Sequence, residues 1–272
     1  MIELQFWYMF PIGTAVATVA MMSGVGGATI FTPLFLLVLK LEPAAALASG
    51  LFIEVFGFTS GVIGYLRKQL IDFSLVKRIV PFTLLGTLGG VVLSQYTPDG
   101  FIELILATIL GYLAIQFFLS NKKCKPVMWP CHNIDTDTTI HNKSLSLKQK
   151  LAFTFGGTLF GSSSSGLGEV NEYVFLERLR LQPGIASGTS VFIIAVSALI
   201  AASFHSFILL FGDTSEILFT IISILVFTVP GVVLGAQIGV RLAAKISTKK
   251  LERVLGVLYG ILALILIGSL IS

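Results

Sequence analysis

Gly161-Ser-Ser-Ser-Ser-Gly-Leu-Gly-Glu-Val-Asn-Glu172 forms a polar, glycine-rich stretch inside an otherwise apolar sequence. A related stretch, Ser23-Gly-Val-Gly-Gly-Ala-Thr29, lies near the amino terminus, and laying Ser23 on Ser165 also superposes two glycines of each stretch. In a lipid bilayer every backbone N–H and C=O group needs a partner, so irregular backbone persists at membrane depth only where it is buried in protein or lines a wet cavity. Two such breaks, at matching places in two halves of a chain, predict the binding site of a transporter.

The composition is that of an integral membrane protein. Of the 272 residues, 55% are hydrophobic and 12% are charged, whereas roughly 25% of residues are charged in a soluble domain. The apolar segments are longer than the roughly 9–11 residues of a membrane β-strand and do not alternate with polar residues, so we expect an all-α, polytopic helical membrane protein. The net charge of +4 is small and dispersed, and no nucleic-acid partner is expected. No basic residue precedes Lys40, so we expect no cleaved signal peptide.

Hydropathy and turn signals divide the chain into a first membrane repeat (1–120), a cytoplasmic linker (121–148) and a second membrane repeat (149–272). Each repeat is expected to contain a broken, re-entrant helical hairpin followed by three full spans. The piece after the first break, 29–40, would reach only about 18 Å as a helix, which is short of the roughly 30 Å hydrocarbon core. The expected helices are 5–22, 29–40, 43–66, 79–94, 101–120, 149–162, 170–180, 183–211, 217–245 and 251–271.

The two repeats are expected to be inverted relative to each other. The pattern of Pro43–Phe52 recurs in Pro183–Phe192, and that of Val80–Leu93 recurs in Val229–Leu242. Basic residues follow the long third element of the first repeat, whereas the corresponding loop of the second repeat, 205–216, has no Lys or Arg. By the positive-inside rule we expect a multi-pass protein of the plasma membrane, with the linker in the cytoplasm and both termini outside.

In inverted repeats the two breaks meet near the middle of the bilayer. Short helices starting after the breaks, at Thr29 and Val170, would point N–H groups and positive dipole ends into a shared cavity, which favours a small anionic substrate. Hydroxyl groups early in the long third helices would complete that cavity, although hydroxyls in membrane helices also bond their own backbone. The alternative is that the glycines only permit close helix packing, as we expect for Gly86/Gly90 and Gly235/Gly239. The predicted substrate-binding residues are Ser23, Gly24, Gly26, Gly27, Thr29, Ser49, Ser164, Ser165, Gly166, Gly168, Asn171, Thr189 and Ser190.

Three glutamates are candidates for coupling transport to an ion. Glu54 lies in the middle of an apolar segment, where a charged carboxylate is costly unless it faces a cavity or a partner, and it is the leading candidate to bind a coupling proton or sodium ion. The alternative for Glu54 is a protonated side chain that only packs. Glu169 and Glu172 would share a helix face beside the second break, and they repel an anion unless they are protonated, bound to a cation or paired with a base. Arg178 or Arg180 would supply that base, or would only mark the cytoplasmic end of the segment.

The remaining polar residues suggest no further chemistry. Cys124, Cys131, His132 and His141 lie in the linker at a spacing unlike that of zinc sites, and reduced cytoplasmic cysteines are expected to form no disulfide. The sequence has no nucleophile elbow, phosphate loop or HExxH motif. We therefore expect no enzyme, no metal and no cofactor.

A set of short motifs occurs in the same order in both halves: Gly24-Val-Gly-Gly27 with Pro33, Ala46–Ser49, Tyr65-x-Arg67-Lys68 before Ile71-Asp72, Gly86/Gly90, Gly166-x-Gly168, Ala186-x-Gly-Thr-Ser190 and Pro230–Gly239. In its order and double occurrence this pattern resembles the TauE/SafE family of sulfite and sulfonate exporter-like membrane permeases over nearly the whole chain. The resemblance implies a two-repeat plasma-membrane transporter of sulfur-containing or other small organic anions. Glu169 stands where the family commonly has a third glycine, which points to a different ligand or a cation-linked mechanism.

Three functions are compatible with this sequence. The first is a secondary transporter, an exporter by resemblance, that holds sulfite, a sulfonate or a related anion between the two breaks and is coupled to protons or another ion. The second is a passive anion channel with the same lining. The third is a membrane scaffold or receptor that acts through a protein partner of the cytoplasmic linker.

Overall fold

The structure, a computed structural model, describes residues 4–23, 26–119, 145–179, 181–210, 215–242 and 248–271, and in these residues it is helical with no β-strand. Five helices are long and apolar enough to cross a membrane, and the apolar stretches Ala28–Leu37, Glu103–Ile115 and Leu255–Gly268 are shorter. The expected polytopic helical membrane protein is therefore confirmed. The elements are a 3-10 helix η1 (Leu4–Tyr8), α1 (Met9–Ser23), α2 (Ala28–Leu37), α3 (Pro43–Arg67), α4 (Phe73–Tyr96), α5 (Asp99–Leu119), α6 (Leu147–Ser163), α7 (Leu167–Glu172), a π-helical turn η3 (Tyr173–Arg178), α8 (Pro183–Leu210), α9 (Ser215–Leu242) and α10 (Thr248–Ile271).

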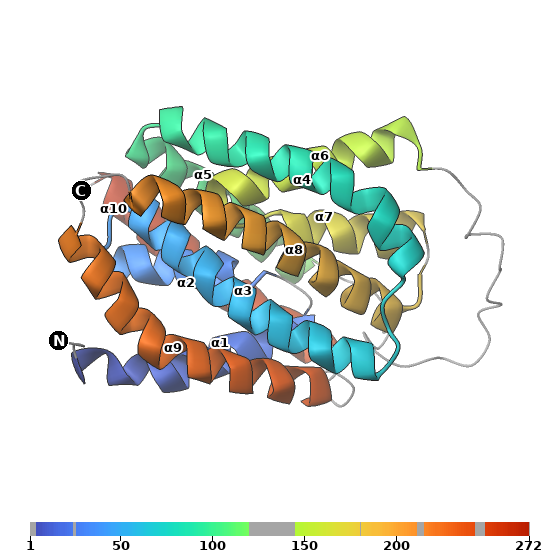
Figure 1. The fold of residues 1–272 in the computed structure, drawn as a ribbon, viewed down its shortest axis with the longest axis horizontal. Helices are drawn as coiled ribbons and strands as arrows, with labels where there is room; N and C mark the ends of the chain where they lie inside the picture. The colour runs from blue at the N-terminus through green and yellow to red at the C-terminus, as the bar shows by residue number, and fades with distance from the viewer. Residues whose placement is uncertain are drawn as a thin grey trace.

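Two helical hairpins enter the bundle from opposite ends. In Figure 1, α1 runs inward from the end that holds both termini and α2 returns toward that end, whereas α6 runs inward from the opposite end and α7 returns to it. We call α1–α2 the first hairpin and α6–α7 the second hairpin. At about 1.5 Å per residue, the 10 residues of α2 reach only halfway across a bilayer. Both hairpins are therefore re-entrant, and their turns face each other in the interior.

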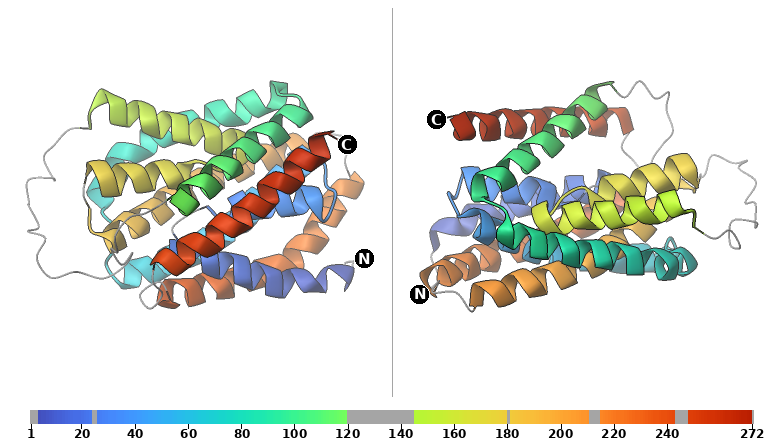
Figure 2. Two further views of the ribbon diagram at one scale, coloured as in Figure 1. Left: turned by 180° about the vertical axis from the view of Figure 1, so that it is seen from behind. Right: turned by 90° about the horizontal axis from the view of Figure 1, so that it is seen from above.

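Corresponding helices of the two halves run in opposite directions and pack on corresponding partners. In Figure 1, α3 runs from left to right and α8 from right to left, and α4 and α9 are related in the same way. The most extensive packing joins α4 to α6 and α1 to α9. These two pairs are equivalent, because α6 is the counterpart of α1 and α9 is the counterpart of α4. The pairs α3–α8 and α5–α10 also pack together, and Figure 2 shows α5 and α10 side by side on one face. This arrangement is that of two inverted halves about a pseudo-twofold axis.

Glycines at the α4–α6 contact allow the two backbones to touch. A Cβ atom on Gly86 would lie 2.0 Å from the Thr154 carbonyl oxygen, and one on Gly90 would lie 2.1 Å from that of Thr158. Gly235 and Gly239 approach α1 in the same way. The packing role expected for these four glycines is confirmed, because any side chain would force the helices apart.

Most helix boundaries lie within a few residues of those expected. The largest difference is at α4, which begins at Phe73 rather than at 79, because the Asp72 side chain accepts from the backbone N–H groups of Ser74 and Leu75 and caps the helix there.

A smaller difference, at α7, affects the candidate site. Helix α7 begins at Leu167 rather than at Val170, because Ser164 (φ 55°) and Gly166 (φ 98°) both adopt left-handed backbone and complete the turn sooner. At Gly166 a side chain would be strained and would meet Leu159. The earlier start places Glu169 in the first turn of α7.

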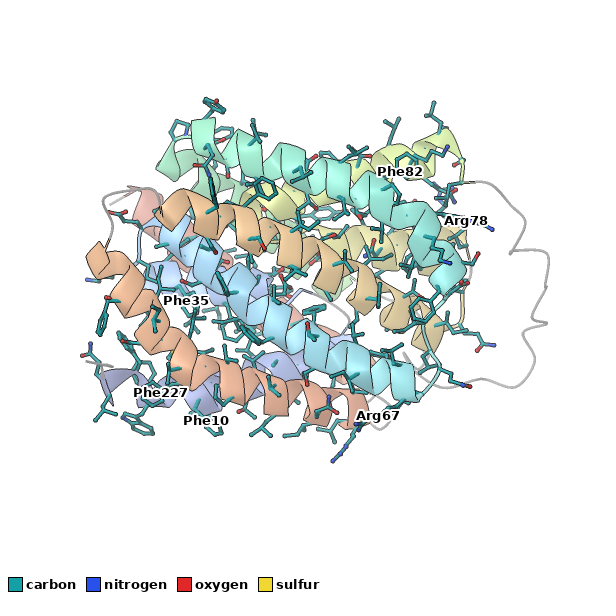
Figure 3. The ribbon with its side chains drawn as sticks, in the orientation of Figure 1. Phe10, Phe35, Arg67, Arg78, Phe82 and Phe227 are labelled. Atoms are coloured by element: carbon teal, nitrogen blue, oxygen red, sulfur yellow. The ribbon has the colours of Figure 1, made fainter. Side chains whose placement is uncertain are left out.

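Basic residues gather at one end of the molecule. Figure 3 shows Arg67 and Arg78 at the end where α3 finishes and α4 begins, opposite to the chain termini of Figure 1. The start of α6 lies at the same end and carries Lys148 and Lys150. Elsewhere, large apolar side chains face outward, such as Leu85, Phe155 and Leu264, each more than 60% exposed. An apolar perimeter with basic groups at one end is the surface of a protein that spans a bilayer.

Candidate functional site

The turn of the second hairpin is a buried cluster of hydroxyl groups, which we call the serine turn (162–166). Its four serines are at most 8% exposed: Ser162 and Ser163 end α6, and Ser164 and Ser165 lie between α6 and α7. Ser163 Oγ lies 3.2 Å from Ser165 Oγ and also donates to the Leu159 carbonyl at 2.8 Å. Three of these hydroxyls donate to backbone carbonyls of Leu159 and Ser163, and because hydroxyl groups rotate they can donate to an oxyanion ligand instead.

One hydrogen bond joins the two hairpins directly. Thr32 Oγ1 on α2 lies 2.7 Å from Ser164 Oγ, and neither side chain is exposed. Ser164 donates its proton to the Ser163 carbonyl at 2.7 Å, so Thr32 is the donor in the bond between the hairpins. The serine turn therefore lies against α2, as the inverted-repeat expectation requires.

Glu54 of α3 lies at the break of the first hairpin. The backbone N–H of Ala28, the first residue of α2, donates to Glu54 Oε1 at 3.4 Å, while Glu54 Oε2 is buried and has no hydrogen-bond partner. A Cβ on Gly26 would lie 3.0 Å from Glu54 Oε1 and 3.3 Å from the Thr29 hydroxyl. The Thr29 side chain is fully buried and its hydroxyl oxygen also lacks a partner. Gly26 therefore leaves room for polar atoms, not for a neighbouring helix backbone.

A second acidic group approaches Glu54 from the opposite hairpin. Both carboxylate oxygens of Glu169 are buried without a hydrogen-bond partner, and the Glu169 carboxyl acts electrostatically on that of Glu54. The Tyr259 hydroxyl on α10 lies within electrostatic range of both carboxyls and of Glu172. Glu172 itself is exposed, so Glu169 and Glu172 lie on one short helix in different environments. The three glutamates are thus separated into a buried pair and an exposed residue.

The other predicted hydroxyl and amide residues have partners in different parts of the bundle. Asn171 donates to Ser190 Oγ at 3.1 Å and keeps an unpartnered, buried carbonyl oxygen, so it joins α7 to α8 beside the break. Ser49 donates to the Ala45 carbonyl of its own helix at 2.7 Å. Thr189 accepts a hydrogen bond from the backbone N–H of Asp72 at 3.0 Å, at the junction of α3 and α4. Asn171 and Ser190 therefore bond each other beside the second break. Ser49 and Thr189 instead bond backbone groups away from it.

Several predicted residues have no described side-chain environment or lie outside the described residues. Ser23 ends α1, but its side chain is not described, and Gly24 is outside the described residues. The cysteines and histidines of the linker, with Arg180, are also outside them. Gly27, Ser165 and Gly168 are buried at the breaks. In the part of the chain that is described, no three His, Cys, Asp or Glu side chains are grouped to hold a metal ion.

Three residues near the breaks had not been predicted. Thr32 follows Thr29 by one helical turn on the same face of α2, and this spacing was its only sequence signal. Tyr259 is a polar residue in an apolar helix, which indicates an inward-facing position. The third is His205 of α8, whose Nε2 lies 3.0 Å from the Gly161 carbonyl oxygen and whose side chain is buried.

The breaks thus bring together two kinds of group. Hydroxyls of the serine turn and of Thr29, with the N-terminal N–H groups of α2, can bind an oxyanion. The buried carboxyls of Glu54 and Glu169 can bind a proton or a cation, because two buried carboxyls within electrostatic range at membrane depth cannot both carry an uncompensated charge.

Comparison with known proteins gives a consistent family. The profile of the family described as sulfite exporter TauE/SafE matches residues 9–266. Sulfite exporter TauE/SafE family protein 5 of Arabidopsis thaliana is 27% identical over 109 residues, which is 39% of this chain and 24% of that protein. Family protein 3 of the same plant is 26% identical over 132 residues, or 44% of this chain and 28% of that protein. The match thus spans about a quarter of the length of these relatives, and no solved structure matches the chain.

Proposed function

Because the chain belongs to the sulfite exporter TauE/SafE family of membrane transporters, we propose that it carries a small oxyanion, sulfite or a sulfonate, across the plasma membrane. The observation that supports this proposal most directly is the contact between the two re-entrant hairpins, Thr32 to Ser164 at 2.7 Å. It brings the hydroxyls of the second break against the N-terminal half of α2, and buried hydroxyl groups can hydrogen-bond a desolvated oxyanion.

The proposed carrier works by alternating access. The substrate binds between the breaks, and the two inverted halves rock against each other so that the site opens first to one side and then to the other. The hydroxyl groups of Ser164, Ser165 and Thr29 would replace part of the hydration shell of the anion. Glu54 or Glu169 would carry the coupling proton or cation, and Glu172 is exposed on the same short helix as Glu169.

The proposed orientation follows from the basic end of the molecule. Helix ends at this end carry Arg67, Lys68, Lys77 and Arg78, and positive charge is retained on the cytoplasmic side. Lys68 Nζ also donates to the Val240 carbonyl at 3.0 Å, so the ends of α3 and α9 lie together there. We therefore propose that this end faces the cytoplasm and that the termini lie outside.

The test is transport by the purified, full-length chain in liposomes. Sulfite, methanesulfonate and sulfate are offered outside, and accumulation above the outside concentration is measured under an imposed pH or sodium gradient. Uphill accumulation of sulfite or methanesulfonate supports a coupled carrier, whereas dissipative flux alone means a channel. No flux of either anion overturns the proposed function.

A pair of glycine variants tests the location of the site. Gly26→Leu places a side chain on Glu54 and Thr29 and should abolish transport. The matched control is Gly111→Leu, where an added Cβ meets no atom within 4 Å. Wild-type transport by a correctly folded Gly26→Leu protein would remove the first break from the site.

A further inference from the structure

The N-terminus of α2 has a side chain in the place where an anion would bind. Its N-cap residue, Gly27, offers no side chain to the first N–H groups of the helix, which are the groups that bind anions at helix ends. The backbone N–H of Ala28 instead donates to the carboxyl of Glu54, which comes from the neighbouring helix α3. Glu54 therefore acts as a tethered anion at the end of α2.

The contact between Glu54 and the Ala28 N–H is weak enough for another anion to replace it. The distance of 3.4 Å from the Ala28 N–H to Glu54 Oε1 is long, since a strong N–H···O bond is about 2.9–3.0 Å. The second oxygen, Oε2, is buried without a partner, and so is the hydroxyl of Thr29 beside it. A buried carboxylate with one weak bond is far from the two to three bonds that normally stabilise its charge.

We propose that Glu54 occupies the anion-binding end of α2 in the substrate-free carrier, and that the transported oxyanion displaces it while Glu54 takes up a proton. This inference rests on the proposed function and specifies how the same site is coupled. In the step, the oxyanion accepts the N–H groups of α2, the Glu54 carboxylate leaves them, and one proton from the water on the open side forms the O–H bond of the acid. No other bond is made or broken.

The surroundings of Glu54 contain few other groups that titrate. Glu169 on α7 acts on it electrostatically, and Tyr259 on α10 interacts with both. Of the helices packed on α3, α1 and α2 have no titratable side chain, and α8 has only His205, which is bonded to the Gly161 carbonyl. The titratable residues of α5 are Asp99, Glu103 and Tyr112, and those of α9 are Glu216 and Arg241 near its two ends.

Two negative charges cannot occupy this site together, and that exclusion is the source of the coupling. The end of α2 accommodates either an ionised Glu54 or the bound oxyanion, and a neutral Glu54 accompanies the anion in the second case. A singly charged sulfonate would thus move with one proton and without net charge. When the anion leaves, the carboxylate returns to the N–H groups as the proton is released.

Proton uptake on binding is the measurement that tests this inference. Methanesulfonate is the probe, because it stays ionised and any proton must go to the protein. It is added to the purified protein in weakly buffered detergent solution containing a pH-sensitive dye. Over the pH range in which Glu54 is ionised in the free protein, we expect uptake of about one proton per bound sulfonate and an affinity that falls about tenfold per pH unit.

Two variants test whether Glu54 is the group that takes up this proton. Glu54→Gln keeps an oxygen that accepts from α2 but cannot take up a proton. Methanesulfonate binding to this variant should therefore neither take up nor release protons, and its affinity should not change with pH. Glu42→Gln is the matched control, because Glu42 is exposed and makes no capping bond. It should behave as the wild type.

The outcomes separate this inference from the proposed function. Sulfonate binding by the wild type without proton uptake at any pH from about 5 to 9 overturns the inference and leaves an anion carrier. The same holds if Glu54→Gln retains the uptake. If Glu54→Gln does not fold, the wild-type proton count still decides the matter. Absence of any binding or flux of sulfonate and sulfite removes the proposed function, and with it this inference.

Discussion

Removing the hydrogen bond between Thr32 and Ser164 should lower the free energy of unfolding measurably, and the effects of substituting its two partners should not add. Thr32→Val preserves the shape of the side chain and removes the donor, and Ser164→Ala removes the acceptor. The bond is 2.7 Å long and both residues are fully buried. A hydrogen bond is worth about 1 kcal/mol net in proteins, and measured interhelical bonds in membranes average about 0.6 kcal/mol with a maximum of about 1.7 kcal/mol.

From these values we expect each single variant to lower the free energy of unfolding by about 1 kcal/mol, a factor of about five in the equilibrium constant. The loss in the double variant should be about 1 kcal/mol smaller than the sum of the two single losses, because both single variants remove the same bond between the hairpins; the bond from Ser164 to the Ser163 carbonyl is lost in the single and the double variant alike and cancels in this comparison. The assay is equilibrium unfolding of the purified protein by denaturing detergent in mixed micelles, measured for the wild type, both single variants and the double variant.

The control cycle combines Ser164→Ala with Thr108→Val. The Thr108 hydroxyl is exposed on α5 and donates at 2.7 Å to the Leu104 carbonyl of its own helix. These two effects should add within about 0.5 kcal/mol, as distant sites do. If the Thr32/Ser164 cycle is equally additive, the two hairpins are not energetically linked at this bond and the account of their contact is wrong.

Three further predictions concern packing, capping and the buried acids. Gly86→Ala should lower the free energy of unfolding by about 1–3 kcal/mol in the same detergent assay, because its Cβ would overlap the Thr154 carbonyl; Gly111→Ala should change it by less than about 0.5 kcal/mol. Asp72→Ala removes the acceptor of two N–H bonds at the start of α4 and should cost about 0.5–2 kcal/mol; thermal unfolding measures this loss, and an unchanged midpoint would contradict the cap. Glu169→Gln should leave the proton count near one per bound methanesulfonate, since the displaced carboxyl lies on α3; loss of the uptake in this variant would assign the proton to α7 instead.

Much of the fold could be predicted from hydropathy and from the glycine and proline residues that mark helix boundaries. Segment lengths alone distinguish α2, which has 10 residues, from α3, which has 25. This difference predicts a half-length piece beside a full span. The expected 43–66 and 183–211 helices are found at Pro43–Arg67 and Pro183–Leu210 because each opens with a proline, which suits the first turn of a helix. The start of α7 was missed because left-handed backbone at Ser164, a non-glycine residue, leaves no clear mark in the sequence.

The candidate site could be predicted as a region but not as a set of contacts. The sequence indicates that hydroxyls and glycines gather at the two breaks, yet Thr32 and Ser164 are 132 positions apart, and their meeting depends on the rotation of α2 about its axis. The same local pattern places a hydroxyl at Thr189 and at Ser190, but the first bonds the Asp72 backbone and the second accepts from Asn171. Neighbouring residues on a helix point about 100° apart, so only the packing of α7 and α8 decides between them.

The two halves have similar backbones but different side chains at the two breaks. With the offset that aligns Pro43 with Pro183, Glu54 corresponds to Ile194, which is apolar and buried. Only α2 therefore has a carboxyl from the following helix at its N-terminus. In an inverted pair with identical side chains, the inward-open and outward-open states would be equivalent by symmetry and equal in free energy. Because the buried carboxyls differ between the two breaks, with Glu54 of α3 at the first and Glu169 of α7 itself at the second, protonation changes the free energies of the two states unequally, and a pH gradient can then set the direction in which such a carrier moves its substrate.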